Sequence, residues 1–244
     1  MGLLGVGDLH PGGHAATELL LNELESCTSR RILELGAGIG LTTARLLERG
    51  WRVTPVEPSP ILREILARRV PVERVLTSMD ELDVAPASFD ATIGEGVLYS
   101  LALSDLLPKL HRLIRPGGLL AVADVALAEG VDPGLVASVH RRTKSLFGFP
   151  MVPERVLTWT RWTDLLSGAG FSPVFVRRVR LDDRPPTDRK ERLSRARAMA
   201  RRPWLALPYL KFRIWGRRAW MPPGSTEGWV ATFRRNGDTK DIAA

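Results

Sequence analysis

The sequence predicts an α/β fold in which a mostly parallel, seven-stranded sheet is covered by helices on both faces. Three observations carry this prediction. Short apolar runs of strand length alternate with helical segments along most of the 244 residues, a pattern typical of parallel sheets. The first of these runs leads into a glycine-rich turn and then a helix. Ordinary apolar (44%) and charged (25%) fractions also exclude a largely disordered chain.

Seven segments are predicted as strands because they are short, apolar and bounded by glycine, proline or charged residues. In chain order they are residues 31–35, 51–56, 72–77, 89–94, 119–125, 171–180 and 228–235. The third has the weakest pattern.

The predicted helices follow from apolar residues at helical spacing and from the residues at their ends. Gly50 ends the second helix, and Ser59 with Pro60 begins the third. The helical segments are residues 14–26, 41–49, 60–69, 101–114, 132–147, 160–168 and 189–202.

Composition divides the chain into parts. We expect an N-terminal lid or helix, a core, a basic and aromatic-rich helical insertion, a last core strand and a disordered tail. Their boundaries are residues 1–30, 31–180, 181–227, 228–235 and 236–244.

The net charge of +8 is concentrated near the C-terminus. Residues 1–180 carry 20 basic and 20 acidic side chains, whereas residues 189–218 carry 11 basic side chains and one acid. This stretch is open to four interpretations: a solvated helix with a cap on the sheet, association with an anionic membrane surface, binding of nucleic acid, or arginines that hold an anionic acceptor.

Several classes of protein are excluded or disfavoured. No run of about 18 uncharged apolar residues is present, which argues against a transmembrane helix. Cys27 is the single cysteine, and four scattered histidines show no ligand spacing, so we expect neither an internal disulfide nor a metal site. We therefore expect a cytoplasmic protein, with a peripheral position at a membrane surface left open.

The most informative segment is the loop Glu34-Leu35-Gly36-Ala37-Gly38-Ile39-Gly40. Glycines between a strand and a helix let the backbone approach a ligand. Glu57 ends the second strand, where a carboxylate can accept both hydroxyls of a ribose. A dinucleotide fingerprint would need glycine at Leu41, and Glu34 would repel a pyrophosphate. The acid instead suits a cationic amino-acid portion, which favours S-adenosylmethionine (SAM).

Five segments in consistent order and spacing carry a resemblance to a known family. They are residues 34–40, 57–59 (Glu-Pro-Ser), 88–101 (Ser-Phe-Asp, then Leu-Tyr-Ser-Leu), 113–120 and 168–171. Over roughly residues 30–180 the chain resembles the class I SAM-dependent methyltransferases, particularly the small-molecule and lipid type. The resemblance implies a Rossmann-like fold, SAM as cofactor and methyl transfer by direct displacement.

The resemblance also implies a set of cofactor-binding residues. They are Glu34, Gly36, Ala37, Gly38, Gly40, Glu57, Pro58, Ser78, Met79, Asp80, Gly94, Glu95 and Gly96. The sequence departs from the family after the third strand, where the usual adenine-contacting aspartate aligns with Ser78, so the contact is open between Ser78, Met79 and Asp80.

Catalysis of this kind needs mainly alignment, so a general base is not obligatory. His14, which opens the first helix, and Tyr99, which follows the fourth strand, are the catalytic candidates. Asp124 is expected near the site, because a lone buried carboxylate is costly.

The sequence thus leads to one main hypothesis and two alternatives. The first is a SAM-dependent methyltransferase acting on a small-molecule or lipid-like acceptor. The second is a binding protein of the same fold that docks on RNA or an anionic membrane through its basic segment. The third, a nicotinamide-dependent oxidoreductase, is disfavoured by Glu34 and Leu41.

Overall fold

The computed structural model describes residues 10–147, 150, 152–153, 157–179, 200, 210, 221–222 and 224–237. Its helices and strands are, in chain order, α1 (Gly13–Leu24), β1 (Arg31–Leu35), α2 (Leu41–Glu48), β2 (Arg52–Val56), α3 (Pro60–Arg69), η2 (Met79–Glu81), β3 (Phe89–Glu95), η3 (Leu98–Ser100), α4 (Leu103–Leu113), β4 (Ile114–Leu127), α5 (Pro133–Phe147), α6 (Trp159–Gly168), β5 (Phe171–Val179) and β6 (Thr226–Arg235).

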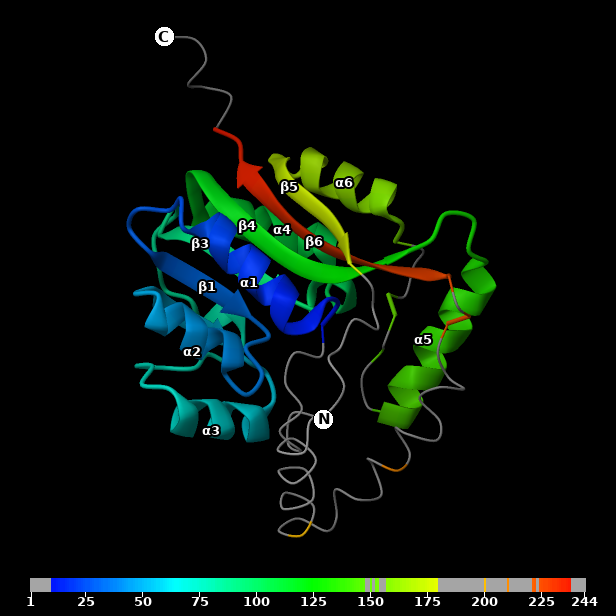
Figure 1. The fold of residues 1–244 in the computed structure, drawn as a ribbon, viewed down its shortest axis with the longest axis horizontal. Coiled ribbons are helices and arrows are strands. Elements are labelled where there is room, and N and C mark those ends of the chain that lie inside the picture. The colour runs from blue at the N-terminus through cyan, green and yellow to red at the C-terminus, as the bar shows by residue number, and fades with distance from the viewer. Residues whose placement is uncertain are drawn as a thin grey trace.

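The strands form one sheet in the order β2-β1-β3-β4-β6-β5 (Figure 1). Strands β2, β1, β3 and β4 are parallel, and β6 is antiparallel to both β4 and β5. The mostly parallel α/β sheet predicted from the sequence is therefore confirmed.

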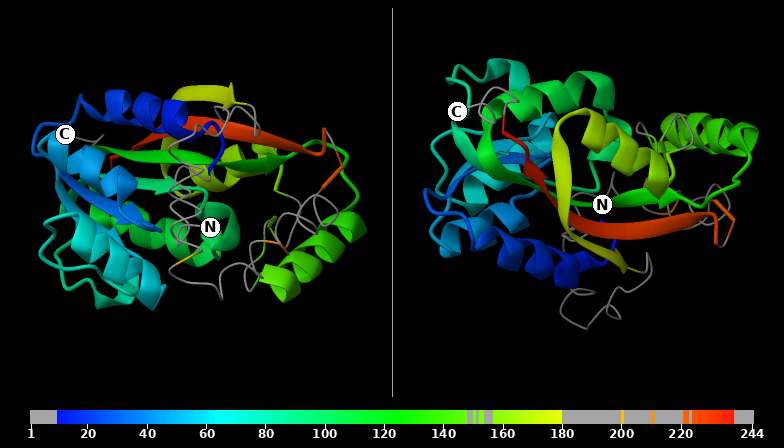
Figure 2. Two further views of the ribbon diagram at one scale, coloured as in Figure 1. Left: turned by 60° about the horizontal axis from the view of Figure 1, so that its bottom comes forward. Right: turned by 90° about the horizontal axis from the view of Figure 1, so that it is seen from above.

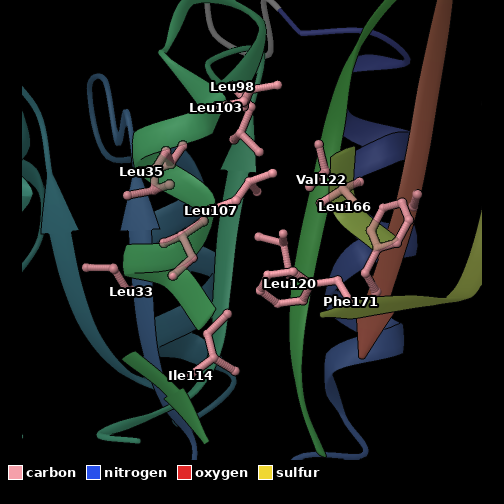
Figure 3. Close-up of a cluster of buried hydrophobic side chains, with 14 of the residues drawn as sticks. Leu33, Leu35, Leu98, Leu103, Leu107, Ile114, Leu120, Val122, Leu166 and Phe171 are labelled. Atoms are coloured by element: carbon pink, nitrogen blue, oxygen red, sulfur yellow. The ribbon is translucent and has the colours of Figure 1, made fainter. Parts of the chain in front are cut away.

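Helices cover both faces of the sheet, as the views in Figure 2 show for α1 on one side and α4 and α6 on the other. Successive side chains of a strand point to opposite faces. On β1, Ile32 packs with leucines of α1 and α2, while Leu33 joins the cluster formed with α4 and α6. Figure 3 shows this second cluster, in which Leu107 of α4 and Leu166 of α6 pack against the sheet.

The sheet has six strands among the described residues, not the seven expected. The predicted third strand, residues 72–77, is reduced to a single bridge between Leu76 and Val56. Pro55 accepts a hydrogen bond from the Leu76 N–H, but it has no N–H of its own to continue the ladder on that side. Within the segment Leu76 alone is fully buried, so little apolar surface favours a longer strand.

Helix α5 lies at the far end of the sheet, beyond most of the other elements (Figure 1). Strands β4 and β6 extend to reach it, because their pairing continues to Leu127 and Thr226. The helix packs through Val136 and Val139 on a small cluster that includes Leu127. Of the helices that the structure describes, none combines the length and apolar character needed to cross a membrane.

The basic insertion predicted over residues 181–227 lies mostly outside the described residues, and so do residues 1–9 and 238–244. Strand β6 begins at Thr226, two residues before the predicted start of the last strand. Asn236, assigned from the sequence to the tail, donates a backbone hydrogen bond to Gly170.

Candidate functional site

The glycine loop connects β1 to α2, as predicted. Gly36, Gly38 and Gly40 all have positive φ, between 58° and 79°, which favours glycine. Side-chain carbons added to Gly36 or Gly40 would crowd Val97 and Leu66, at 3.0 and 2.9 Å. A carbon added to Gly38 would meet nothing closer than 3.9 Å. The loop is therefore packed at both ends and open at Gly38, where a ligand can approach its backbone.

Glu57 follows β2 and is buried beside this loop. Its carboxylate accepts backbone hydrogen bonds from Gly38 and from Ser59, each of 2.8 Å. Two fixed N–H donors orient the side chain toward the open part of the loop. A carboxylate in that position can accept hydrogen bonds from a diol such as a ribose.

Glu34 lies on the face of β1 that α1 and α2 cover. It is 4% exposed, and its Oε2 accepts a hydrogen bond of 2.7 Å from the Thr43 hydroxyl. Burial raises the pKa of Glu34 to about 8, and the nearby charges of Glu95 and Glu57 act in the same direction. Glu34 is therefore mostly uncharged at neutral pH until a cation comes near it.

Glu95 ends β3 and is the third carboxylate at the loop. Its two oxygens accept hydrogen bonds from Thr17 of α1 (2.7 Å) and Thr42 of α2 (2.6 Å). His10 lies 3.4 Å from the same carboxylate, and both side chains are more than nine-tenths buried. The ends of three strands thus bring three carboxylates to one loop, an arrangement that fits a ligand with a cationic group and a diol.

Asp124 of β4 organises the chain beyond β3. Its Oδ2 accepts backbone hydrogen bonds from Leu98 (2.8 Å) and Tyr99 (3.2 Å), and its Oδ1 accepts one from Val125 (2.7 Å). Burial raises the pKa of Asp124 to about 7, although these N–H groups oppose the shift. The side chain is near the site, as expected, and it fixes the position of η3.

Tyr99 lies in η3 and packs against the main core. Its hydroxyl donates a hydrogen bond of 3.1 Å to the Pro150 carbonyl. Burial raises the pKa of Tyr99 to about 12, and the Asp124 charge adds to this effect. The phenol therefore stays protonated and can position a neighbouring group but not remove a proton from it.

His14 is placed differently from the other candidates. Its side chain is 59% exposed on α1, and its contact is with Glu18, 4.0 Å away. The described residues give it no hydrogen bond or ion pair with the glycine loop. The histidine that reaches the site is His10, which the sequence analysis did not single out.

The remaining candidates surround the loop at different depths. Ala37 donates a backbone hydrogen bond to Val56, and Pro58 is exposed beside Glu57. Gly94 and Gly96 flank Glu95, and a carbon added to Gly94 would clash with Leu98.

The segment after the single Leu76 bridge holds the three candidates for the adenine contact. Ser78 caps η2 by accepting the Asp80 N–H. Met79 packs against the main core, and exposed Asp80 pairs with Lys109 at 2.8 Å. Throughout the described part of the chain, no group of three or more His, Cys, Asp or Glu side chains could hold a metal ion.

Similarity to known proteins agrees with this geometry. The methyltransferase domain family matches residues 33–122. The uncharacterised methyltransferase YodH of Bacillus subtilis is 27% identical over 176 residues, covering 70% of this chain and 72% of YodH. The crystal structure of MccD superposes with a TM-score of 0.67 at 13% identity, covering 94% of this chain and all of MccD. The structure of geranyl diphosphate C-methyltransferase of Streptomyces coelicolor, in complex with S-adenosylhomocysteine (SAH), superposes with a TM-score of 0.62 at 15% identity. The match covers 91% of this chain and 80% of that one.

The matched segment contains the glycine loop, Glu57 and Glu95, which are the residues that the geometry brings together. The chain therefore belongs to the class I SAM-dependent methyltransferases, and SAM is its cofactor.

Proposed function

We propose that this methyltransferase transfers a methyl group to a small-molecule or lipid-like acceptor, bound beside η3 at the carboxyl edge of the sheet. The observation that carries the proposal is the convergence of Glu34, Glu57 and Glu95 on a glycine loop that is open at Gly38. In open α/β sheets, ligands bind outside the carboxyl ends of the strands.

Each group around the loop has a proposed role toward SAM. Glu57 accepts the ribose hydroxyls, while Glu34 and Glu95 face the ammonium group of the methionine portion. The loop backbone and the glycines beside Glu95 let the cofactor approach closely, and the segment after β2 contacts adenine. The residues in these last two groups are Gly36, Ala37, Gly38, Gly40, Gly94 and Gly96, and Pro58, Ser78, Met79 and Asp80.

The chemistry asks little of the protein beyond alignment. SAM, when bound, would supply an electrophilic methyl group, which would form a bond to a nucleophilic atom of the acceptor as its bond to sulfur breaks and SAH leaves. Alignment and exclusion of water alone can supply about 7–11 kcal/mol. Tyr99 is proposed to position the acceptor through its hydroxyl oxygen, because the raised pKa keeps the phenol neutral and its proton is donated to Pro150. The exposed position of His14 gives no support to a catalytic role for that residue.

The class of acceptor is supported by the protein's neighbours in structure. Two solved neighbours act, by their printed names, on geranyl diphosphate and on 1,6-didemethyltoxoflavin, both small molecules. Contact of residues 189–218 with an anionic surface, including a membrane, stays a prediction from their charge. Salt-dependent retention of the intact protein on anionic vesicles would test it.

Isothermal titration with SAH and with NAD tests the proposed function. SAH should bind, and Glu57→Ala should weaken its binding by about tenfold or more, because the ribose loses a charged acceptor. Gly38→Arg should abolish binding, since the side chain would fill the open part of the loop. Glu48→Ala, which changes an exposed carboxylate on α2, is the matched control and should bind SAH like the wild type. Binding of NAD and not SAH would overturn the proposal.

A further inference from the structure

The turn that precedes α1 is built into the edge of the sheet where the cofactor site lies. A side-chain carbon on Gly96, after β3, would lie 3.2 Å from the Cβ of His10. A carbon on Gly228, in β6, would lie 2.8 Å from the Cβ of Pro11. Because glycine occupies both of these positions, the turn packs directly on the backbone there.

The ring of His10 contacts Thr17, Pro11 and Glu95. Thr17 gives its hydroxyl proton to Glu95 at 2.7 Å, so its oxygen can only accept from the His10 Nε2, 3.3 Å away. The Nδ1 lies 3.3 Å from the Pro11 carbonyl, which is also an acceptor. Both ring nitrogens therefore lie near oxygen atoms, and an N–H on Nε2 would be directed to the side on which Thr17 and Glu95 lie. The Nε2 also lies 3.4 Å from the Glu95 carboxylate.

Glu95 is held from two directions. Thr17 of α1 and His10 of the preceding turn contact its Oε1, and Thr42 of α2 donates a hydrogen bond of 2.6 Å to its Oε2. Thr42 lies in the first turn after the glycine loop, so the carboxylate is fixed against the loop itself. Acids this close to one another make ionisation costly, and hydrogen-bond donors directed at Glu95 offset part of that cost.

We propose that His10 is a positioning residue of the cofactor site, which holds the Glu95 carboxylate in place to receive the ammonium group of SAM. This inference rests on the proposed function, because it assigns Glu95 to the methionine end of the cofactor. If His10 had a purely structural role, its loss would lower the stability of the protein and leave the affinity for SAH unchanged.

Titration of the full-length protein with SAH separates the two. His10→Ala should raise the Kd for SAH about tenfold or more, because Glu95 loses the buried ring nitrogen that lies 3.4 Å from its Oε1. His10→Gln keeps an N–H donor toward Glu95 and should recover most of the affinity. His14→Ala removes an exposed histidine four residues away and should match the wild type. Thermal unfolding of each variant without ligand monitors its stability.

Each alternative result counts against the inference. An unchanged Kd in His10→Ala, with or without a lower Tm, overturns it, and so does equal weakening in the Ala and Gln variants. If His10→Ala does not fold, Thr17→Val takes its place, since it removes the hydroxyl donor to Glu95 at nearly constant volume. A wild type that binds no SAH contradicts the proposed function itself, and the role of His10 then falls with it.

Discussion

Two of the carboxylates at the glycine loop are held in different ways. Glu57 receives two backbone N–H groups, whereas Glu34 receives its hydrogen bonds from Thr43 and lies in the interior of the domain. Burial therefore dominates at Glu34 and raises its pKa from 4.5 to about 8. A carboxyl whose pKa is raised on folding contributes stability that is full below pH 4.5 and is lost as the pH rises through 8.

Glu34→Gln should therefore stabilise the empty protein in alkaline solution. At pH 8.5 the wild type carries a buried carboxylate and the variant a neutral amide, a difference on the order of 2 kcal/mol. For a chain of this size we expect the Tm of the variant to be higher by about 4–8 °C. Near pH 4.5 both side chains are neutral, so the two Tm values should converge.

Thermal unfolding from pH 4.5 to 8.5 measures this difference directly. Glu48→Gln, at an exposed position on α2, should show no comparable dependence on pH relative to the wild type. A Glu34→Gln variant that is less stable than the wild type at pH 8.5 would contradict the assignment of a buried, mostly neutral Glu34.

The site also shows which residues a sequence can reveal. Glu34 and the loop glycines are predictable because a strand, a turn and a helix place them within a few residues of one another, and Glu57 is predictable because it ends the next strand. His10 is 85 positions from Glu95 in the sequence, and the packing of the turn on Gly96 and Gly228 brings the two together. His14 was favoured because it opens the helix, but α1 turns its side chain outward.

At the scale of elements, η3 is a short helix fixed by one side chain. Asp124 accepts hydrogen bonds from the backbones of Leu98 and Tyr99, and thereby sets where Tyr99 stands. The same carboxylate also accepts a hydrogen bond from the N–H of Val125, which lies in β4 itself. The side chain therefore connects the end of β3 to its neighbouring strand.

Asp124→Asn should loosen this connection. Asparagine has one acceptor oxygen in place of two, and its amide group would face a backbone N–H. Leaving a buried N–H without a partner costs about 1–3 kcal/mol, which lowers the Tm by several degrees. Asp83→Asn, at an exposed position, is the matched control and should unfold like the wild type. Equal Tm values for the two variants would rule out the role assigned to Asp124.

Most elements were predictable from local pattern, and those that differed did so for reasons of tertiary structure. Helix α3 has the predicted ends because Ser59 and Pro60 define its start. The third strand is reduced to a bridge because Pro55, on the neighbouring strand, cannot donate a hydrogen bond. Strand β4 extends past its predicted end, since β6 pairs with it as far as Leu127. A partner strand more than 90 residues away leaves no local signal in the sequence.

At the scale of the whole molecule, the topology explains why acids gather at one place. Parallel strands β2, β1 and β3 are adjacent, so their carboxyl ends lie at the same edge of the sheet. Glu57, Glu34 and Glu95 lie at or near these ends. Burial, and to a lesser extent repulsion from Glu95 and Glu57, raises the pKa of Glu34. A cationic ligand relieves this repulsion.

Binding of SAH should therefore release protons. At pH 7 the carboxyl of Glu34 is mostly protonated in the empty protein, and an ammonium group beside it favours the carboxylate. We expect the release of up to about one proton per SAH bound, and an affinity that rises with pH up to about 8. Titration in phosphate and in Tris at pH 7 measures the release, because the apparent enthalpy then varies with the ionisation enthalpy of the buffer. In Glu34→Gln the same titrations should give nearly equal enthalpies. Equal enthalpies in the wild type would mean that the ammonium group does not bind beside Glu34.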